Sequence, residues 1–384
     1  MAAVSWRVTE SIAYGASDPS YRKMVLAALV IGLVFVFSAS FPLADRTLDG
    51  DNPFHFLYRQ LLFMVLGVVP LYLVSRLTPT AVTKLAYWLF IPGLLTMVLC
   101  RWSPWAHPVG GNWCWLKVHG VQLQPGELVK VVYVALLACY LARSVKTKEE
   151  QNQTWLSIAT VMAAMCGALV LQKDLGTLFL ITGLTLVLLF IRGVNGWLLG
   201  GVTGLLGGSA MLGIYLFVPD RWERIVIFLD PQSDPLGAGY HLCLMLATLA
   251  RGGLAWLGLG MSPDKWGALP APHTDSVFCI IGAELGILGA GLILVLVYMM
   301  TARALKIAQR ARTPVAWYLG CGIGLLLGLQ SIINIAVATV SMPCAGLTLP
   351  FISAGGSSLI SSMIAAGIVL GISRSGTTEP RGDG

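Results

Sequence analysis

Long apolar runs separated by short polar segments dominate the chain. Ten of these runs are close to the ~20 residues that a helix needs to cross a bilayer. They cover residues 24–41, 59–76, 84–100, 126–143, 155–171, 175–192, 197–218, 276–301, 315–340 and 355–373. The pattern predicts an all-α membrane protein with about ten transmembrane helices in one domain, residues 24–373. Residues 1–23 are then a cytoplasmic leading segment and residues 374–384 a polar, disordered cytoplasmic tail.

The first run has a second interpretation as a signal peptide, because Ser38-Ala39-Ser40 resembles a small-residue cleavage site. We favour a retained span. The polar lead and the apolar run are both long, and removal would leave an odd number of spans.

Composition agrees with a membrane protein. The chain is 56% hydrophobic and 11% charged, against roughly 45–50% and about 25% in soluble domains. The net charge of +7 comes from short loops, which fits membrane topology and argues against nucleic-acid binding. The eight cysteines form no CxxC pair and lie mostly inside apolar runs, so we interpret them as small buried hydrophobic residues.

Basic residues predict the orientation. Lys and Arg concentrate in one set of short loops, and in the opposite set acidic residues dilute them. The positive-inside rule therefore places both termini in the cytoplasm and the loops 42–58, 101–125, 219–275 and 341–354 outside. Two outer loops are long. The tryptophan-rich loop 101–125 is expected to lie on the bilayer surface, and loop 219–275 is expected to carry an interfacial or re-entrant segment at Leu242–Leu249.

One acidic residue stands where an irregular segment meets the eighth apolar run. Prolines and a glycine interrupt residues 264–272, and His273-Thr274-Asp275 then leads into apolar sequence up to about Tyr298. Ionisable groups at the start of a membrane-spanning run are functional candidates, because a charge is costly to place in the bilayer. We therefore predict that Asp275 is the catalytic base and that the other spans build a pocket around it. Glu284 falls on the opposite helix face and is expected to pair with a neighbouring span.

Two further polar sites each allow a structural and a functional interpretation. Glu127 and Lys130 are three residues apart at the start of the fourth run and share a helix face. They form either a structural ion pair or a substrate contact. Asp174 is either the N-cap of the next helix or a polar group that faces a cavity.

The outer loops add basic and hydroxyl groups. Arg224 and Lys265 belong to a basic cluster that is suited either to a diphosphate or to anionic lipid headgroups. The segment 343–358 contains Ser353, Gly355, Gly356 and Ser357. Hydroxyls and free N–H groups at a helix start suit a sugar or a phosphate, and the alternative is a tight turn.

Two stretches carry a family resemblance, LPAPHTDS at 269–276 and LPFISAGGSS at 349–358. With Gln124–Lys130 and Gln172–Thr177 they resemble the SEDS family (shape, elongation, division, sporulation), from Ser38 to about Ser373, and most closely its division members. The resemblance implies an enzyme of the bacterial plasma membrane, at the division septum, that polymerises lipid II into peptidoglycan and releases undecaprenyl diphosphate. It also implies a class B penicillin-binding protein and other division proteins as partners. By the sequence the chemistry requires no cofactor, although Mg²⁺ or Mn²⁺ is compatible with it.

The resemblance also implies roles for single residues. Asp275 falls on the essential aspartate of the family, and His273 lies in the same motif. Trp115 falls on a family tryptophan, and Arg224 and Lys265 fall on family basic positions. The sequence departs from the family at four positions: Cys114, Lys173, Ala271 and Ala354 replace arginine, proline, glutamate and tyrosine.

These residues suit a glycosyl transfer from a lipid diphosphate. A hydrolase commonly uses two carboxylates, one of which protonates the leaving oxygen, but a diphosphate leaves without a proton. Asp275 would deprotonate the acceptor hydroxyl, while Arg224, Lys265 or a divalent cation stabilises the diphosphate. Two alternatives are a transporter of lipid-linked precursors and a non-enzymatic division scaffold. Transporters often show inverted repeats, and we find none in the sequence.

Overall fold

The computed structural model describes residues 15–47, 53–109, 111–118, 121–217, 219–237, 239–254, 256–267 and 269–376. Its helices before the large outer loop are α1 (Pro19–Thr47), α2 (His55–Ser75), α3 (Pro79–Trp102), α4 (Pro125–Leu141), α5 (Lys148–Gln172), α6 (Leu175–Ile191) and α7 (Gly196–Phe217). The outer loop holds α8 (Pro219–Leu229), η1 (Pro231–Ser233), α9 (Tyr240–Gly252) and η2 (Pro263–Trp266). The chain continues with α10 (Val277–Gln309), α11 (Pro314–Ala338) and α12 (Gly356–Gly376).

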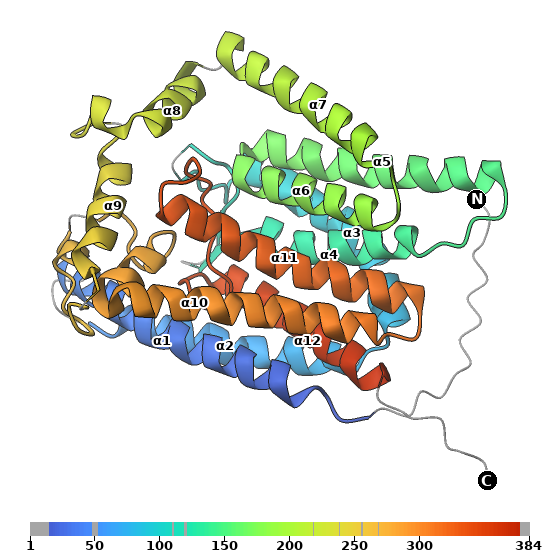
Figure 1. The fold of residues 1–384 in the computed structure, drawn as a ribbon, viewed down its shortest axis with the longest axis horizontal. Coiled ribbons are helices and arrows are strands. Elements are labelled where there is room, and N and C mark those ends of the chain that lie inside the picture. The colour runs from blue at the N-terminus through green and yellow to red at the C-terminus, as the bar shows by residue number, and fades with distance from the viewer. Residues whose placement is uncertain are drawn as a thin grey trace.

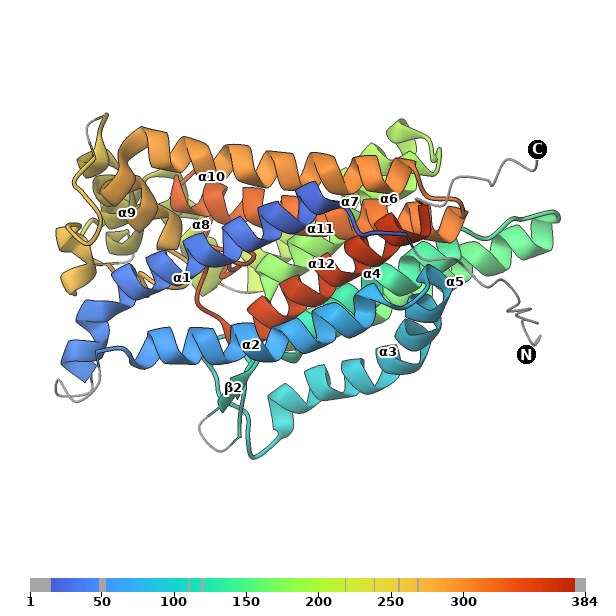
Figure 2. The ribbon, with the colours of Figure 1, turned by 90° about the horizontal axis from the view of Figure 1, so that it is seen from below.

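The long helices form a bundle with two distinct ends (Figures 1 and 2). At one end the backbone N–H of Gly15 donates to the carbonyl of Arg374 at 3.1 Å, so the two ends of the described chain lie side by side. α9 lies at the opposite end, whereas α7 leans away from the bundle (Figure 1). The segment before α10, which contains Asp275, lies at the end that carries α9 (Figure 1).

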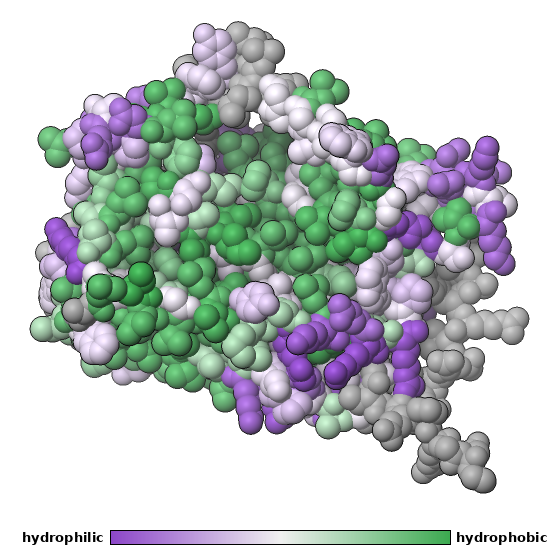
Figure 3. Space-filling view, viewed as in Figure 1, coloured by the Kyte–Doolittle hydropathy of each residue, from purple (hydrophilic) through white to green (hydrophobic). Residues whose placement is uncertain are grey.

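The surface and the core both fit a lipid environment. Apolar residues cover the middle of the molecule, and hydrophilic residues gather towards its ends (Figure 3). Large side chains such as Leu66 and Trp88 are exposed on α2 and α3, as expected for surfaces that face lipid. α12 is mostly buried and packs closely on α2, because a Cβ at Gly367 would meet the Leu71 carbonyl oxygen at 2.6 Å.

Each of the ten apolar runs contains a helix, as predicted. Within the described residues, α1, α2, α3, α5, α10, α11 and α12 are long and apolar enough to cross a membrane. α4 has 17 residues, and α6 and the described apolar part of α7 are also shorter than the seven helices just named. The number ten therefore stays a prediction. Residues 1–14 and 377–384, expected to be a leading segment and a tail, lie outside the described residues.

Some local features differ from the expectation. α1 begins at Pro19, five residues before the predicted start at 24, and Ser38, Ala39 and Ser40 are buried within it. These three residues pack as part of the bundle. Loop 101–125 contains an antiparallel hairpin of β1 (Leu116–Val118) and β2 (Val121–Leu123), which was not predicted. The apolar piece at 242–249 is helical, within α9.

Candidate active site

The last outer loop folds back onto the segment that precedes α10. The backbone N–H of Ala354 donates to the carbonyl of His273 at 2.8 Å. The Ser353 hydroxyl donates to the carbonyl of Thr274 at 2.7 Å and accepts from the N–H of Leu349 at 2.9 Å. The two stretches that carried the family resemblance, about 80 residues apart in the chain, are therefore in direct contact.

Asp275 stands at the entrance to α10. Asn334 of α11 fixes its backbone, donating to the carbonyl of Asp275 at 3.3 Å and to that of Leu347 at 2.6 Å. The Asp275 residue is partly exposed, and no described residue hydrogen-bonds to its carboxylate. Burial raises the pKa of Asp275 to about 6. A carboxylate with this pKa is a stronger base than an ordinary aspartate and is still largely ionised at neutral pH.

A cavity of about 160 Å³ opens beside the residues that precede Asp275. Its walls come from α2, the hairpin, the segment before α10 and the start of α12, and include Arg59, Trp115, His273, Thr274, Gly355 and Gly356. Four of the candidates from the sequence, Trp115, His273, Gly355 and Gly356, thus line one cavity.

Among the described residues that line the cavity, Arg59 is the one with a charged side chain. His273 packs against Phe56 with ring centroids 4.9 Å apart. Burial, and secondarily the positive charge of Arg59, lowers the pKa of His273 to about 4, so this imidazole is neutral at pH 7. Arg59 therefore provides the positive charge of the cavity. Sequence reasoning missed Arg59, although a charged residue at the first position of the run 59–76 was a usable signal.

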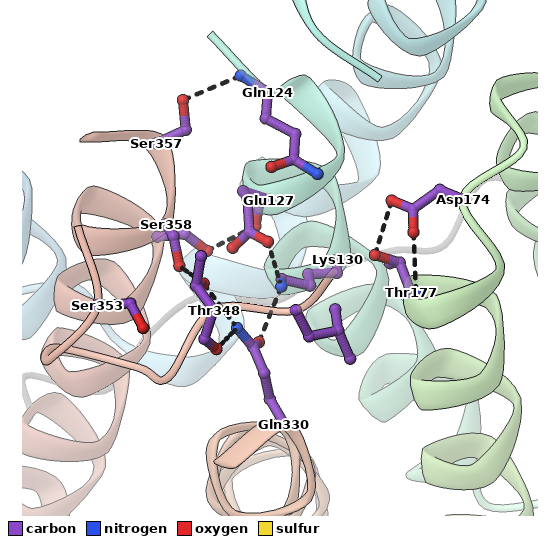
Figure 4. A network of polar contacts seen from close by, with 12 residues as sticks. Gln124, Glu127, Lys130, Asp174, Thr177, Gln330, Thr348, Ser353, Ser357 and Ser358 are labelled. Atoms are coloured by element: carbon purple, nitrogen blue, oxygen red, sulfur yellow. Dashed lines mark hydrogen bonds and ion pairs between the residues drawn. The ribbon is translucent and has the colours of Figure 1, made fainter. Parts of the chain in front are cut away.

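A buried polar network lies between α4, α11 and the last loop (Figure 4). Lys130 Nζ lies 2.7 Å from Glu127 Oε1 and 2.8 Å from Gln330 Oε1. The Gln330 amide donates in turn to the carbonyl of Thr348 at 2.9 Å. The predicted Glu127–Lys130 ion pair is therefore confirmed, and a substrate contact stays a prediction. Gln330 and Asn334, four residues apart in an apolar run, share one face of α11, and that spacing was a signal the sequence analysis did not use.

The remaining hydroxyl and acidic candidates hold helix starts. Asp174 caps α6, accepting from the N–H of Thr177 at 3.0 Å and from its hydroxyl at 2.8 Å (Figure 4). The N-cap interpretation is thereby confirmed. Ser357 accepts from the N–H of Gln124 at 3.0 Å, which ties α12 to the start of α4.

The basic candidates of the large outer loop lie elsewhere. Lys265 is buried, with its Nζ 2.8 Å from Glu284 Oε1, and it does not line the cavity. Glu284 was expected to pair with a neighbouring span, and it does accept hydrogen bonds from Ser38 of α1. Its ionic partner is Lys265 of η2. Arg224 belongs to α8, but its side chain lies outside what the structure describes. In the part of the chain that the structure describes, no three His, Cys, Asp or Glu side chains gather in a way that could hold a metal ion.

Fold and site together define a class of protein, a helical multi-pass membrane protein with a carboxylate-bearing site at one end of its bundle. The chain belongs to the FtsW/RodA/SpoVE family of cell cycle proteins, whose model matches residues 20–378. The SEDS resemblance inferred from the motifs is therefore confirmed.

Individual relatives agree with this assignment. The chain is 35% identical to a protein of Coxiella burnetii named "Probable peptidoglycan glycosyltransferase FtsW", over 90% of this chain and 93% of that protein. It is 34% identical to stage V sporulation protein E of Bacillus subtilis, over 91% of this chain and 95% of that protein. A solved chain of a peptidoglycan synthase complex matches with a TM-score of 0.76 and 28% identity, covering 95% of this chain and 99% of that one.

Proposed function

We propose that this chain is a peptidoglycan glycosyltransferase that polymerises lipid II into glycan strands. The family membership supports the proposal, as do relatives named for this activity. The observation that carries it is Asp275, a carboxylate with a pKa raised to about 6 and no described hydrogen-bond partner. Asp275 does not itself line the cavity, but His273 and Thr274, which precede it in the chain, do.

The chemistry requires one base. Asp275 takes the proton from the 4-hydroxyl of the acceptor sugar as that oxygen bonds to C1 of the donor. The bond from C1 to the phosphate oxygen breaks, and undecaprenyl diphosphate leaves as an anion with inversion at C1. The leaving group is stable without protonation, so no second carboxylate is needed.

The cavity suits the polar part of a lipid-linked sugar. Arg59 offers a fixed planar cation to a phosphate oxygen, and Gly355 and Gly356 present backbone at the start of α12, where helix N-termini favour anions. The indole of Trp115 gives a flat apolar wall for a sugar ring. In this arrangement Arg59 takes over the role that the sequence suggested for Lys265.

The setting of the reaction follows from the same proposal. The site lies outside the membrane and both termini lie in the cytoplasm of a bacterial cell, at the division septum. A class B penicillin-binding protein would crosslink the strands as they emerge. The similarity to a chain of a peptidoglycan synthase complex supports such a partner.

Purified protein incubated with lipid II tests the proposal. The reactions are run with and without a class B penicillin-binding protein, each in Mg²⁺ and in EDTA, and are scored for glycan polymer. We expect polymer from the wild type, none from Asp275→Asn, and near-wild-type amounts from Asp18→Asn, a matched control at the other end of the bundle. Absence of polymer under every condition would overturn the proposal. Movement of labelled lipid II across vesicles would then indicate a transporter, and its absence a scaffold.

A further inference from the structure

Three buried residues from distant parts of the chain meet at one carboxylate, that of Glu284. Lys265 Nζ lies 2.8 Å from Glu284 Oε1 and 3.0 Å from the Ser38 hydroxyl. The Ser38 hydroxyl lies 2.7 and 2.8 Å from the two oxygens of Glu284. Glu284 is fully buried, and Lys265 and Ser38 are at most 9% exposed. α1, η2 and α10 are thus joined at one carboxylate.

Glu284 lies where α10 is broken. Gly286 has φ 65° and ψ −164°, so the first part of α10, residues 277–285, is separated from the rest of the helix. The outer segment bonds to the backbone at this break. Gly258 donates to the carbonyl of Glu284 at 3.0 Å, and Ile287 donates to that of Gly253 at 3.1 Å. Backbone hydrogen bonds to the outer loop therefore hold the break in α10, in addition to the hydrogen bonds within the helix.

Asp275 immediately precedes this short helical part, at the end away from Glu284. The carboxylate of Asp275 has no described partner of its own. Its placement therefore depends on the backbone around it, namely the Asn334 contact and the anchoring of residues 277–285. We propose that Glu284 is a positioning residue for glycosyl transfer: its contacts with Lys265 and Ser38 hold the first part of α10 so that Asp275 faces the acceptor. This inference rests on the proposed function.

A second ion pair provides a matched control. Arg303, further along α10, binds Asp18 at the start of α1, with Nη2 2.6 Å from Oδ2. It joins the same two helices at the other end of the bundle, about 29 Å from Glu284 at ~1.5 Å per residue. Asp18→Asn can keep the hydrogen bond that Asp18 accepts from the N–H of Tyr21, and it removes the charge and one of the two oxygens that accept from Arg303. Glu284→Gln likewise keeps the shape of the side chain.

The experiment measures kcat and the KM for lipid II, together with thermal unfolding in detergent, for the wild type and three variants. For Glu284→Gln we expect kcat to fall about tenfold or more with KM within about twofold, since small displacements of a catalytic group cost rate rather than binding. Asp18→Asn should keep both constants. Lys265→Met combined with Glu284→Gln leaves no unpaired buried charge, so its melting temperature should return towards wild type while kcat stays low.

The outcomes separate the two proposals. A double variant with wild-type kcat would overturn the positioning role, because stability alone would then explain the single variant. Equal kcat losses in Glu284→Gln and Asp18→Asn would also overturn it. If Glu284→Gln does not fold, the double variant decides. A wild type that forms no polymer contradicts the proposed function instead.

Discussion

Replacing Asp275 with asparagine is expected to abolish polymer formation and, at the same time, to stabilise the folded protein at neutral pH. The structure surrounds this carboxylate with enough protein to raise its pKa from 3.8 to about 6. A raised pKa means that the fold favours the protonated, neutral form. The contribution of Asp275 to stability is therefore fully present below pH 3.8 and is lost as the pH rises through about 6.

The size of this effect follows from the two pKa values. Their difference corresponds to at most about 3 kcal/mol at pH 8, because part of the residue reaches solvent. Asparagine is neutral at every pH and avoids this cost. We therefore expect Asp275→Asn to exceed the wild type in free energy of unfolding by up to about 3 kcal/mol at pH 8, and by less than about 1 kcal/mol at pH 4.

The same pKa predicts the pH dependence of the reaction. A general base acts when deprotonated, so wild-type kcat should rise with pH through about 6, with roughly a tenth of the plateau left at pH 5. An aspartate with its ordinary pKa would give a flat profile between pH 5 and 7. Loss of the base should lower kcat by about 10²–10⁴-fold.

Denaturant unfolding in detergent at pH 4 and pH 8, together with lipid II polymerisation between pH 5 and 8, checks both halves of this prediction. Asp18→Asn is the control, since its carboxylate is bound by Arg303 at the far end of the bundle. An Asp275→Asn protein that is no more stable than the wild type at pH 8, or a wild-type profile that stays flat below pH 7, would refute the reasoning.

Three other substitutions test separate parts of the structure. Arg59→Ala should raise the KM for lipid II about tenfold, because it removes the charge that faces the diphosphate. Arg59→Lys, measured in the same assay, should have a KM between those of Arg59→Ala and the wild type. Lys130→Met should destabilise the protein by about 3–5 kcal/mol by leaving buried Glu127 unpaired, and adding Glu127→Gln should restore most of the melting temperature. Lys173→Gly should stabilise by about 1 kcal/mol, since Lys173 has φ 60°; no rise in melting temperature would contradict that reasoning.

The sequence predicted most of the helices, because each requires only a continuous apolar run. It also predicted that Glu127 would pair with Lys130, because three residues along a helix bring side chains together whatever the rest of the fold does. Asp174 was identified as a cap for the same local reason. Features that depend only on interactions between residues close in sequence could therefore be predicted from the sequence alone.

The parts that the sequence did not predict depend on contacts between distant segments. The position of Arg59 in α2 says nothing about the loop before α10, although the two form one cavity. The charge of Lys265 suggested a contact with a diphosphate, but charge alone does not select a partner. In the fold Lys265 forms an ion pair with Glu284. The hairpin at 116–123 has strands of three residues each, too short for an alternating pattern to be recognised.

The acidic residues of the bundle show why one of them is available as a base. A base needs a carboxylate oxygen that is free to accept a proton, and buried carboxylates are normally committed to partners. Glu127, Asp174 and Glu284 are bound by Lys130, Thr177 and Lys265 respectively, and Asp264 is bound by Arg251. Each of these four carboxylates is therefore already engaged by a cation or a hydroxyl. The carboxylate of Asp275 has no such partner among the described residues and has a raised pKa. Among these five acids Asp275 is thus the one whose carboxylate is bound by no described side chain, which is why we assign it the role of base.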